Sequence, residues 1–404
     1  MAPLLDPDHE EPQPDRVGGR MSTALREFLE TEIAGGALLL AAAIAALVWA
    51  SLAFGSYASV WTGTLPGHLS RAGLPNDLRA LINDGLLTLF FFIVGLEIKR
   101  ELVSGELREK RAAALPVFAA LGGMLAPAAI YLAMTRGSAL HGWGIPMATD
   151  IAFALGALTL FGRGLPQGLR VLLLSIAVAD DIGTLIVIAF FYASGIRWLF
   201  LAAAILLLVG MAIMAHRHVG RSPVYVVLGA GLWWLTLHSG IRPTVAGVAL
   251  GLLIPAGVAR VERMEHLIHP WTSFVVLPLF ALANAGIPIV LAQLGTTAGS
   301  RISLAVLVGR IGGKVVGISL GAWIAVRLGL GLLPNEVGWR HVVALGCVAS
   351  VGFTVPLFVA TLAFDSVGAV NDAKLGILLA TVFGFGIGGL ALRMAAGRER
   401  SKPA

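Results

Sequence analysis

Residues 169–194 read LRVLLLSIAVADDIGTLIVIAFFYAS, an apolar run that carries two adjacent carboxylates, Asp180 and Asp181, near its centre. A transmembrane helix needs about 20 predominantly apolar residues, so this run predicts a helix that crosses a lipid bilayer. A charged side chain at the bilayer centre costs at least about 2.5–3.5 kcal/mol. The two aspartates therefore indicate that the middle of this helix faces other protein or a water-filled cavity, and that a functional site lies there.

The same composition continues along the whole chain. Of the 404 residues, 57% are hydrophobic and 13% are charged, whereas about 25% are charged in a soluble globular protein. This composition excludes a disordered chain and a soluble fold, because too few polar side chains remain to cover a water-exposed surface. The single cysteine, Cys347, excludes a disulfide scaffold or a cysteine-rich metal site.

Apolar runs of comparable length recur, and they predict about twelve transmembrane helices in an all-α membrane protein. The runs lie at 33–53, 85–102, 113–135, 144–162, 169–194, 198–215, 223–238, 243–257, 268–293, 303–326, 340–363 and 375–395. Residues 33–395 are therefore expected to form a single transmembrane domain. The acidic, proline-containing segment 1–32 is expected to be a disordered cytoplasmic tail without a cleavable signal, and residues 396–404 a cytoplasmic C-terminal tail.

The 29 basic and 23 acidic side chains are distributed as in a polytopic membrane protein. Lys and Arg form short clusters between the apolar runs rather than one patch, so no nucleic-acid partner is expected. With the N-terminus in the cytoplasm, most Lys and Arg fall in the tail and the cytoplasmic loops, as the positive-inside rule requires. The pattern predicts an even number of spans, cytoplasmic termini and a lipid bilayer as the surrounding partner.

Five charged residues stand near the middle of predicted spans: Asp150, Asp180, Asp181, Arg310 and Lys314. Left unpaired, they would oppose insertion by about 12–18 kcal/mol in total. Fixed ion pairs between helices are one explanation. Adjacent residues point about 100° apart on a helix, however, so the two neighbouring aspartates do not share one partner easily. Two carboxylates that repel each other in hydrocarbon suit the exchange of protons for a hard cation, which prefers oxygen ligands.

Two of the predicted spans contain glycine and proline in their interior, where both residues weaken the helical hydrogen bonding. These residues are Gly144 and Pro146, ahead of Thr149 and Asp150, and Gly346, Gly352 and Pro356, around Thr354. Paired interrupted spans indicate a midplane site in a transporter built of inverted repeats. We expect Asp150 to offset the positive half-helix ends at such breaks, and Lys314 the negative ones.

Further acids and histidines lie at the ends of predicted spans. They are Asp84, Glu97, Glu101, Glu262 and Glu265, with His266 and His269. For Glu101, Glu262 and the histidines, a solvated helix end is the favoured interpretation. Glu97 and Glu265 fit a solvated end or an acidic cytoplasmic funnel equally well, and such a funnel would concentrate cations.

Five segments together resemble the NhaA family of sodium/proton antiporters. They are GLEIKREL (95–102), ATDIAFALG (148–156), VADDIG (178–183), EHLIHPW (265–271) and LPLFALANAG (277–286), and the resemblance runs from about residue 25 to 395. It implies about twelve helices, an inverted repeat of helices 3–5 and 10–12, and crossed, interrupted helices 4 and 11. It also implies a homodimer in the bacterial inner membrane that exports Na⁺ or Li⁺, with two protons entering per Na⁺. No cofactor, enzymatic activity or organic substrate is implied.

The resemblance also assigns roles by position. Asp181 resembles the principal Na⁺ ligand and Asp180 the partner of Lys314, while Asp150 and Thr149 resemble the charge-compensating, ligand-supporting pair on helix 4. The outer positions are those of cytoplasmic entry and pH response: Asp84 and Glu97 for entry, and Glu265 for pH. The break of helix 11 is assigned to Gly352, Thr354 and Pro356.

Three positions depart from the family pattern. In SGIRPT (239–244), Arg242 stands where the family often has a histidine, and an arginine does not titrate near neutrality. Val315 stands where proline is frequent, and Arg310 lies one turn before Lys314, where an apolar residue is expected. Arg310 is expected to pair with an acid or to line a wet cavity.

Three other functions would each need different features. A sodium-coupled symporter of an organic solute remains the main alternative, because inverted-repeat folds serve many transporters. It would need more solute-binding groups than Thr149, Asn284 and Thr354 provide. An intramembrane aspartyl protease needs its two aspartates on different helices. An ion channel would conduct without saturable proton counter-transport.

Overall fold

The computed structural model describes residues 15–65, 73–162, 164–193, 195–217, 222–254, 258–288, 297 and 299–399. Helices make up nearly all of the ordered structure in these residues, whose only β pairing is an isolated bridge between Thr64 and Asp77. Eight helical stretches of the described chain are long and apolar enough to cross a membrane, or nine if one bent pair counts as a single crossing. The prediction of an all-α membrane protein is therefore confirmed, whereas the count of about twelve stays a prediction.

The first half of the described chain contains helices α1 to α9 and three short turns of other geometry. These are α1 (Asp15–Leu52), α2 (Phe54–Thr62), α4 (Leu78–Leu81), η1 (Ile82–Leu86), α5 (Leu87–Val103), η2 (Glu106–Arg108), α6 (Lys110–Met134), η3 (Gly137–Gly144), α7 (Ile151–Phe161), α8 (Gln167–Phe191) and α9 (Trp198–His216). Because α1 begins at Asp15, helix extends into the predicted tail. Residues 1–14 of that tail lie outside the described residues.

The second half continues with helices α10 to α19. These are α10 (Ser222–Ser239), α11 (Thr244–Leu253), α12 (Val258–Trp271), η4 (Thr272–Val276), α13 (Leu277–Asn284), α15 (Arg301–Val308), η5 (Gly309–Gly313), α16 (Lys314–Arg327), α17 (Trp339–Ala349), α18 (Thr354–Ala363) and α19 (Val367–Glu399). Single π turns (η1, η4 and η5) join α4 to α5, α12 to α13 and α15 to α16 into continuous spans.

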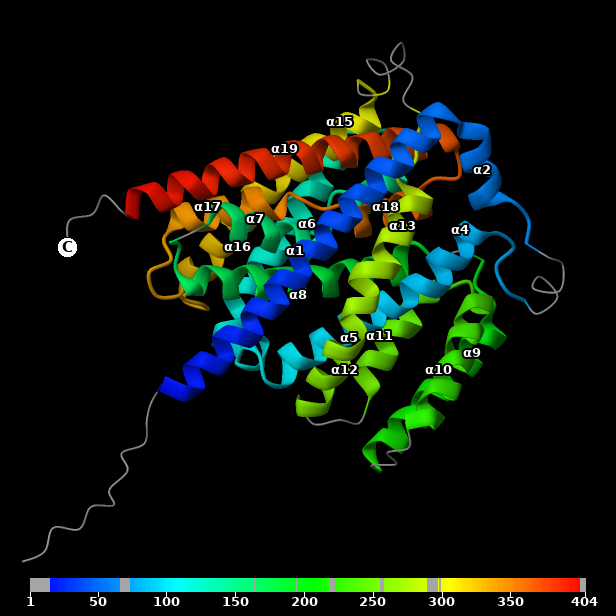
Figure 1. The fold of residues 1–404 in the computed structure, drawn as a ribbon, viewed down its shortest axis with the longest axis horizontal. Coiled ribbons are helices and arrows are strands. Elements are labelled where there is room, and N and C mark those ends of the chain that lie inside the picture. The colour runs from blue at the N-terminus through cyan, green and yellow to red at the C-terminus, as the bar shows by residue number, and fades with distance from the viewer. Residues whose placement is uncertain are drawn as a thin grey trace, which may run out of the picture.

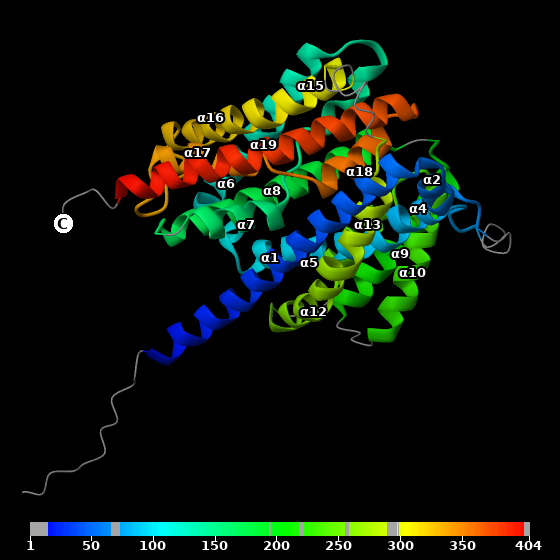
Figure 2. The ribbon, with the colours of Figure 1, turned by 45° about the horizontal axis from the view of Figure 1, so that its top comes forward.

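The helices form two groups that meet along the buried helix α8 (Figure 1). One group contains α6, α7 and α15 to α19, and the other contains α1, α5 and α11 to α13 (Figure 2). The pair α9 and α10 lies at the edge. The start of α1 and the end of α19 lie on the same side of the molecule in Figure 1.

Two helix pairs approach so closely that only glycine fits between them. Where α6 crosses α16, a Cβ on Gly122 or on Gly317 would collide with the carbonyl oxygen of the other residue. Where α5 crosses α11, a Cβ on Gly251 would lie 2.5 Å from the carbonyl oxygen of Phe92. Small residues that let backbones meet are typical of helix packing in membranes.

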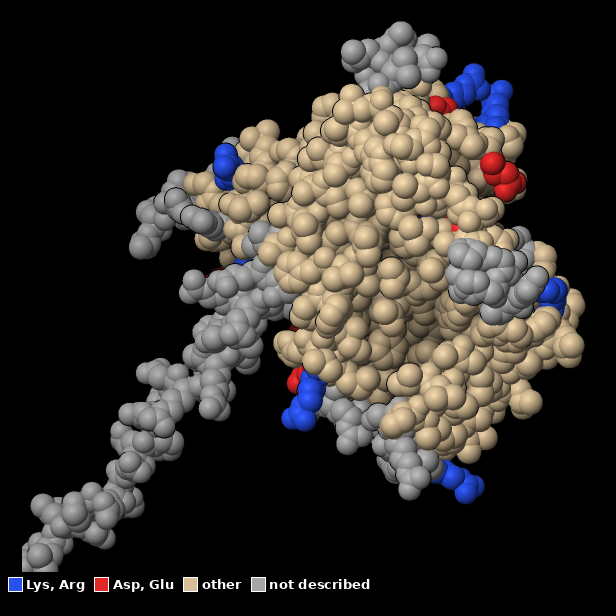
Figure 3. Space-filling model, turned by 45° about the vertical axis from the view of Figure 1, so that its right-hand side comes forward, with Lys and Arg blue, Asp and Glu red and all other residues tan. Residues whose placement is uncertain are grey.

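The outer surface is apolar. Figure 3 shows a broad face almost without charged side chains, and the few Lys, Arg, Asp and Glu residues lie at its margins. Large aliphatic side chains point outward, with Leu52, Leu199 and Leu206 each at least 74% exposed. In water such a surface would be very unfavourable, so it indicates a lipid environment.

The structure contains both interruptions that the glycine and proline pattern predicts. Between η3 and α7 the chain is not helical at residues 148–150, and between α17 and α18 it is not helical at 351–353, where the axes bend by 54°. The two breaks touch: the Asp150 N–H donates to the Val351 carbonyl oxygen at 3.2 Å, and the Thr149 hydroxyl donates to the Ala349 carbonyl oxygen at 3.1 Å.

Candidate functional site

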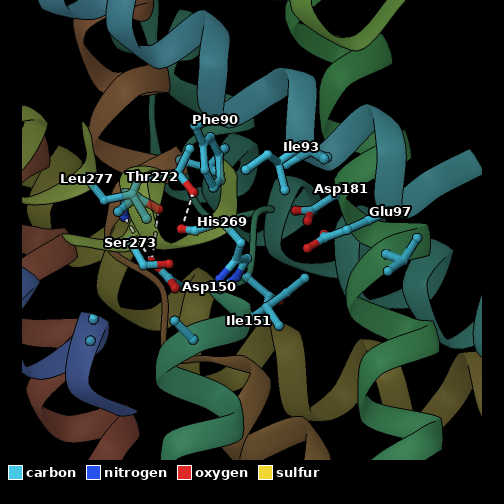
Figure 4. Close-up of a pocket in the computed structure, with 18 of the residues that line it drawn as sticks. Phe90, Ile93, Glu97, Asp150, Ile151, Asp181, His269, Thr272, Ser273 and Leu277 are labelled. Atoms are coloured by element: carbon cyan, nitrogen blue, oxygen red, sulfur yellow. Dashed lines mark hydrogen bonds between the residues drawn. The ribbon is translucent and has the colours of Figure 1, made fainter. Parts of the chain in front are cut away.

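A cavity of about 360 Å³ lies between α1, α5, α8, the α12–α13 span and the two breaks. Four carboxylates line it: Asp181 of α8, Glu97 and Glu101 of α5, and Asp150 of the first break. Figure 4 shows the Asp181 and Glu97 side chains turned toward one another, with His269 and Ser273 on the opposite wall. The cavity therefore extends from Asp181 and Glu97 to the end of α5 that carries Arg100 and Glu101.

The two adjacent aspartates occupy different environments. Asp181 is partly accessible and lines the cavity, and within the described residues no hydrogen bond or ion pair holds its carboxylate. Asp180 is 1% exposed and lies behind it, with Oδ2 2.8 Å from the Lys314 Nζ. The same oxygen accepts the Thr149 N–H at 2.9 Å, whereas Oδ1 is buried and has no partner among the described residues. The 100° step between neighbours on a helix produces this division.

Carboxylates occupy the amide ends of the interrupted helices. Asp150 Oδ2 accepts the Thr354 hydroxyl at 2.9 Å and the Thr354 N–H at 3.3 Å, at the first residue of α18. Asp180 accepts the Thr149 N–H just before α7 begins. A helix N-terminus carries a partial positive charge, so a carboxylate is stabilised there. Asp150 thus lies where the sequence predicted a compensating acid.

The carbonyl ends meet Arg310 rather than Lys314. Arg310 is 0% exposed, and its Nη2 and Nε donate to the Ser350 carbonyl oxygen, directly after α17, at 3.1 and 3.3 Å. Its Nη1 points at the Ile145 carbonyl oxygen, directly after η3, at 3.5 Å. The expectation that Lys314 offsets these ends is corrected here, because the single ammonium of Lys314 is bound to Asp180 while the forked guanidinium reaches both carbonyls.

The break residues of the second interrupted span lie where the sequence placed them. Gly352 is in the nonhelical stretch, and Thr354 and Pro356 lie in the first turn of α18. Proline costs little there, because the N–H groups of the first turn have no partner within the helix.

Asp84 does not line this cavity. It lies in the π turn η1, its Oδ1 is 3.9 Å from the Arg242 guanidinium, and its backbone carbonyl accepts the Trp233 indole N–H at 2.5 Å. Arg242, at the position of the family histidine, is thus the partner of an acid. This pair could not be predicted from sequence spacing, because the two residues are far apart along the chain.

Glu265 lies beside the cavity rather than in it. It is 5% exposed, and its Oε1 accepts the Arg100 Nη1 at 2.7 Å. Arg100 lines the cavity together with His266 and His269. The sequence interpretation favoured a solvated helix end for both histidines, and His266 is indeed exposed. Ser273, from the π turn η4, also lines it and was not identified from the sequence.

No group of three or more His, Cys, Asp and Glu side chains forms a metal site in the parts of the chain that the structure describes.

A family model described as Na⁺/H⁺ antiporter 1 matches residues 26–392. The chain is 43% identical over 381 residues to the Na(+)/H(+) antiporter NhaA of Acidovorax sp. (strain JS42), which covers 90% of each protein. It is 41% identical over 390 residues to the Na(+)/H(+) antiporter NhaA 2 of Erythrobacter litoralis, covering 95% of this chain and 97% of the relative. It is 40% identical over 384 residues to the Na(+)/H(+) antiporter NhaA 1 of Klebsiella pneumoniae, covering 91% and 96%.

Proposed function

Since the chain belongs to the NhaA family of Na⁺/H⁺ antiporters, we propose that it exports Na⁺ or Li⁺ and imports protons through the cavity that ends at Asp181. Members of this family are secondary transporters rather than enzymes, they need no cofactor, and the transported ions are Na⁺ and H⁺. The alternative of an organic-solute symporter finds no support in the family or its relatives.

The observation that carries this proposal is the contrast between Asp181, which lines the cavity, and Asp180, which is buried against Lys314. A carboxylate that water can reach binds either a proton or a hard cation, so the two ions compete for one site. Na⁺ arriving through the cavity binds Asp181 and displaces its proton. The outward-facing form then releases Na⁺ and takes up protons before it returns.

Lys314 supplies the second proton in this scheme. When Asp180 turns to bind the cation with its unpartnered Oδ1, the Lys314 ammonium loses its counter-charge and releases a proton. One Na⁺ then exchanges for two protons, and each cycle moves one net charge. Thr149 and Asp150 support the site, because both lie at the break that lines it.

The broken helices provide the conformational change. We infer an inverted repeat in which α6, α7 and α8 of one half correspond to the α15–α16 span, α17–α18 and α19 of the other, with the interrupted helices crossing at the midplane. The hydrogen bonds between the breaks support this assignment, since each interrupted segment is the middle element of its group. With α10, α11 and the η3–α7 segment added to the nine candidates, the chain would have about twelve spans.

The remaining predictions concern the surroundings of the site. We propose cytoplasmic termini in the bacterial inner membrane, a homodimer, and entry of cations past Glu97 on the cytoplasmic side. The acid at the cavity wall supports this path, since negative charge concentrates cations at an entrance. Glu265, paired to Arg100 at the mouth, is the proposed pH-response residue, and Asp84 contributes through its pair with Arg242.

The test uses everted membrane vesicles that are acidified by respiration and then receive NaCl or LiCl at several pH values. In wild type, either salt should dissipate the pH gradient. Asp181→Asn should reduce the exchange rate at least about 100-fold, because an amide neither titrates nor carries charge. The matched control is Asp365→Asn, which changes an exposed acid after α18 and should leave exchange unaltered.

An Asp181→Asn protein that is present in the membrane and still exchanges Na⁺ for H⁺ would refute the proposed site. Uptake of radiolabelled Na⁺ driven by a pH gradient, with no organic solute present, excludes symport. A rate that responds to an imposed K⁺ diffusion potential supports unequal charge exchange, and a rate indifferent to it contradicts two protons per Na⁺.

A further inference from the structure

We propose that Arg310 is a positioning residue for ion exchange: its guanidinium links the carbonyl ends of the two interrupted helices and supplies a permanent positive charge there. The proposal rests on the function proposed above. It concerns a residue, one turn before Lys314 in the α15–α16 span, that was expected to pair with an acid or to line a wet cavity and that binds backbone carbonyl oxygens instead.

The hydrogen-bond geometry is the first support. The guanidinium contacts Ser350 O after α17 and Ile145 O after η3, so one side chain joins two segments that lie 205 residues apart in sequence. Arginine presents several donors in a rigid planar fork, and this lets it hold two acceptors at a fixed spacing. The breaks that line the cation cavity are thus fastened to each other and to the α15–α16 span.

The charge balance is the second support. Each carbonyl end of a helix carries up to about half an elementary negative charge, so two ends together roughly match one guanidinium. Among the residues that the structure describes, Arg310 makes hydrogen bonds only to backbone carbonyl oxygens. Lys314 is therefore not needed at these ends and can remain with Asp180.

The local backbone is the third support. Arg310 lies in η5, a single π turn whose other members include Gly309, Gly312 and Gly313, and π turns within helices are frequent at functional sites. Gly352 lies against the guanidinium: a Cβ at that position would collide with Arg310 Nη2, and it would also lie 2.9 Å from the Ala148 carbonyl oxygen. Two separate segments are therefore shaped around this one side chain.

The permanent positive charge of Arg310 also sets the net charge of the ionisable groups around the cation site. The charged groups around it are Asp150, Asp180, Asp181 and Lys314, with Glu97 across the cavity. If Glu97 is not counted, the three aspartates and two bases carry one net negative charge when all are ionised, and a single monovalent cation neutralises it. If Arg310 were replaced by a neutral residue, this set would carry two net negative charges and would hold protons and Na⁺ more tightly.

The test compares Arg310→Lys with Arg310→Met in vesicles, at equal amounts of protein in the membrane. Arg310→Lys keeps the charge but reaches only one carbonyl, so we expect a pH profile near that of wild type and a turnover lower by about tenfold or more. Arg310→Met should lose turnover and also shift the remaining activity to more alkaline pH. The control Arg327→Met changes an exposed arginine at the end of α16 and should alter neither property.

A double variant tests the contact with Gly352. Gly352→Ala should reduce turnover in the wild-type protein, and it should reduce turnover by a smaller factor in Arg310→Met, because the contact with the guanidinium is gone while the close approach to the Ala148 carbonyl oxygen remains. Strict additivity of the two changes would contradict the contact. A wild-type profile for Arg310→Met would contradict the proposal itself.

Backbone hydrogen exchange separates this proposal from the proposed function. Arg310→Met should increase amide exchange in residues 147–151 and 351–354, with no comparable change in α9. That measurement needs no transport, so it tests the link between the breaks even if Asp181→Asn proves that the cation site lies elsewhere. Unchanged protection at both breaks would overturn the positioning role.

Discussion

The amide ends and the carbonyl ends of the helices at the breaks have different charged partners. The amide ends meet the carboxylates of Asp150 and Asp180, whereas the carbonyl ends meet the guanidinium of Arg310. Carboxylates change charge when they bind a proton or a cation, and a guanidinium does not. The variable charges thus lie with the amide ends next to the cavity, and the constant charge lies with the carbonyl ends behind it.

The largest effect on this contrast is expected for Lys314→Met. It leaves Asp180 buried without its counter-charge, and removal of one partner of a buried ion pair costs about 3–5 kcal/mol of unfolding free energy. Thermal unfolding in detergent should therefore show a large loss of stability. The double variant Lys314→Met with Asp180→Asn should recover much of it, and an equal loss in both would mean that the ion pair is not the cause.

A smaller effect is expected for Thr354→Val at the amide end of α18. The change keeps the shape of the side chain and removes the hydroxyl that donates to Asp150 Oδ2 at 2.9 Å. A hydrogen bond to a charged group contributes about 1.5–3 kcal/mol, so stability should fall by that order and the apparent KM for Na⁺ should change. Thr361→Val is the matched control, because among the described residues its hydroxyl bonds only to the Phe358 carbonyl within α18. Equal effects of the two variants would show that the hydrogen bond from Thr354 to Asp150 makes no special contribution.

The smallest effect is expected outside the cavity, at the 3.9 Å pair of Arg242 and Asp84, whose side chains are 32% and 15% exposed. Arg242→His should change stability by no more than about 1 kcal/mol, because partly exposed pairs contribute little. An imidazole is charged below its ordinary pKa of about 6.5, so the pair would form at low pH and be lost as the pH rises through that value. Transport by Arg242→His should gain a pH dependence near neutrality that wild type lacks at this position, and identical profiles would show that this pair does not influence exchange.

The sequence predicted the membrane class, both interruptions and the cluster of interior charges, because each depends on local composition and on the cost of charge in lipid. Composition and spacing did not predict which of Asp180 and Asp181 reaches the cavity; only the family resemblance assigned Asp181 to the cation and Asp180 to Lys314. The two differ by a fixed angle, but the rotation of α8 is set by packing against its neighbours. The partners of Arg310 were also hidden, since they are backbone carbonyls of Ile145 and Ser350 and carry no side-chain signature. The pair of Asp84 with Arg242 depends on helices distant in sequence.

The volume of the cavity has a consequence for how an ion would be selected. At about 30 Å³ per molecule in the liquid, a space of about 360 Å³ has room for roughly ten or more waters. The cavity beside Asp181 is therefore large enough for an alkali ion to keep several waters while it exchanges others for protein oxygens. Discrimination among ions would then depend on this partial dehydration.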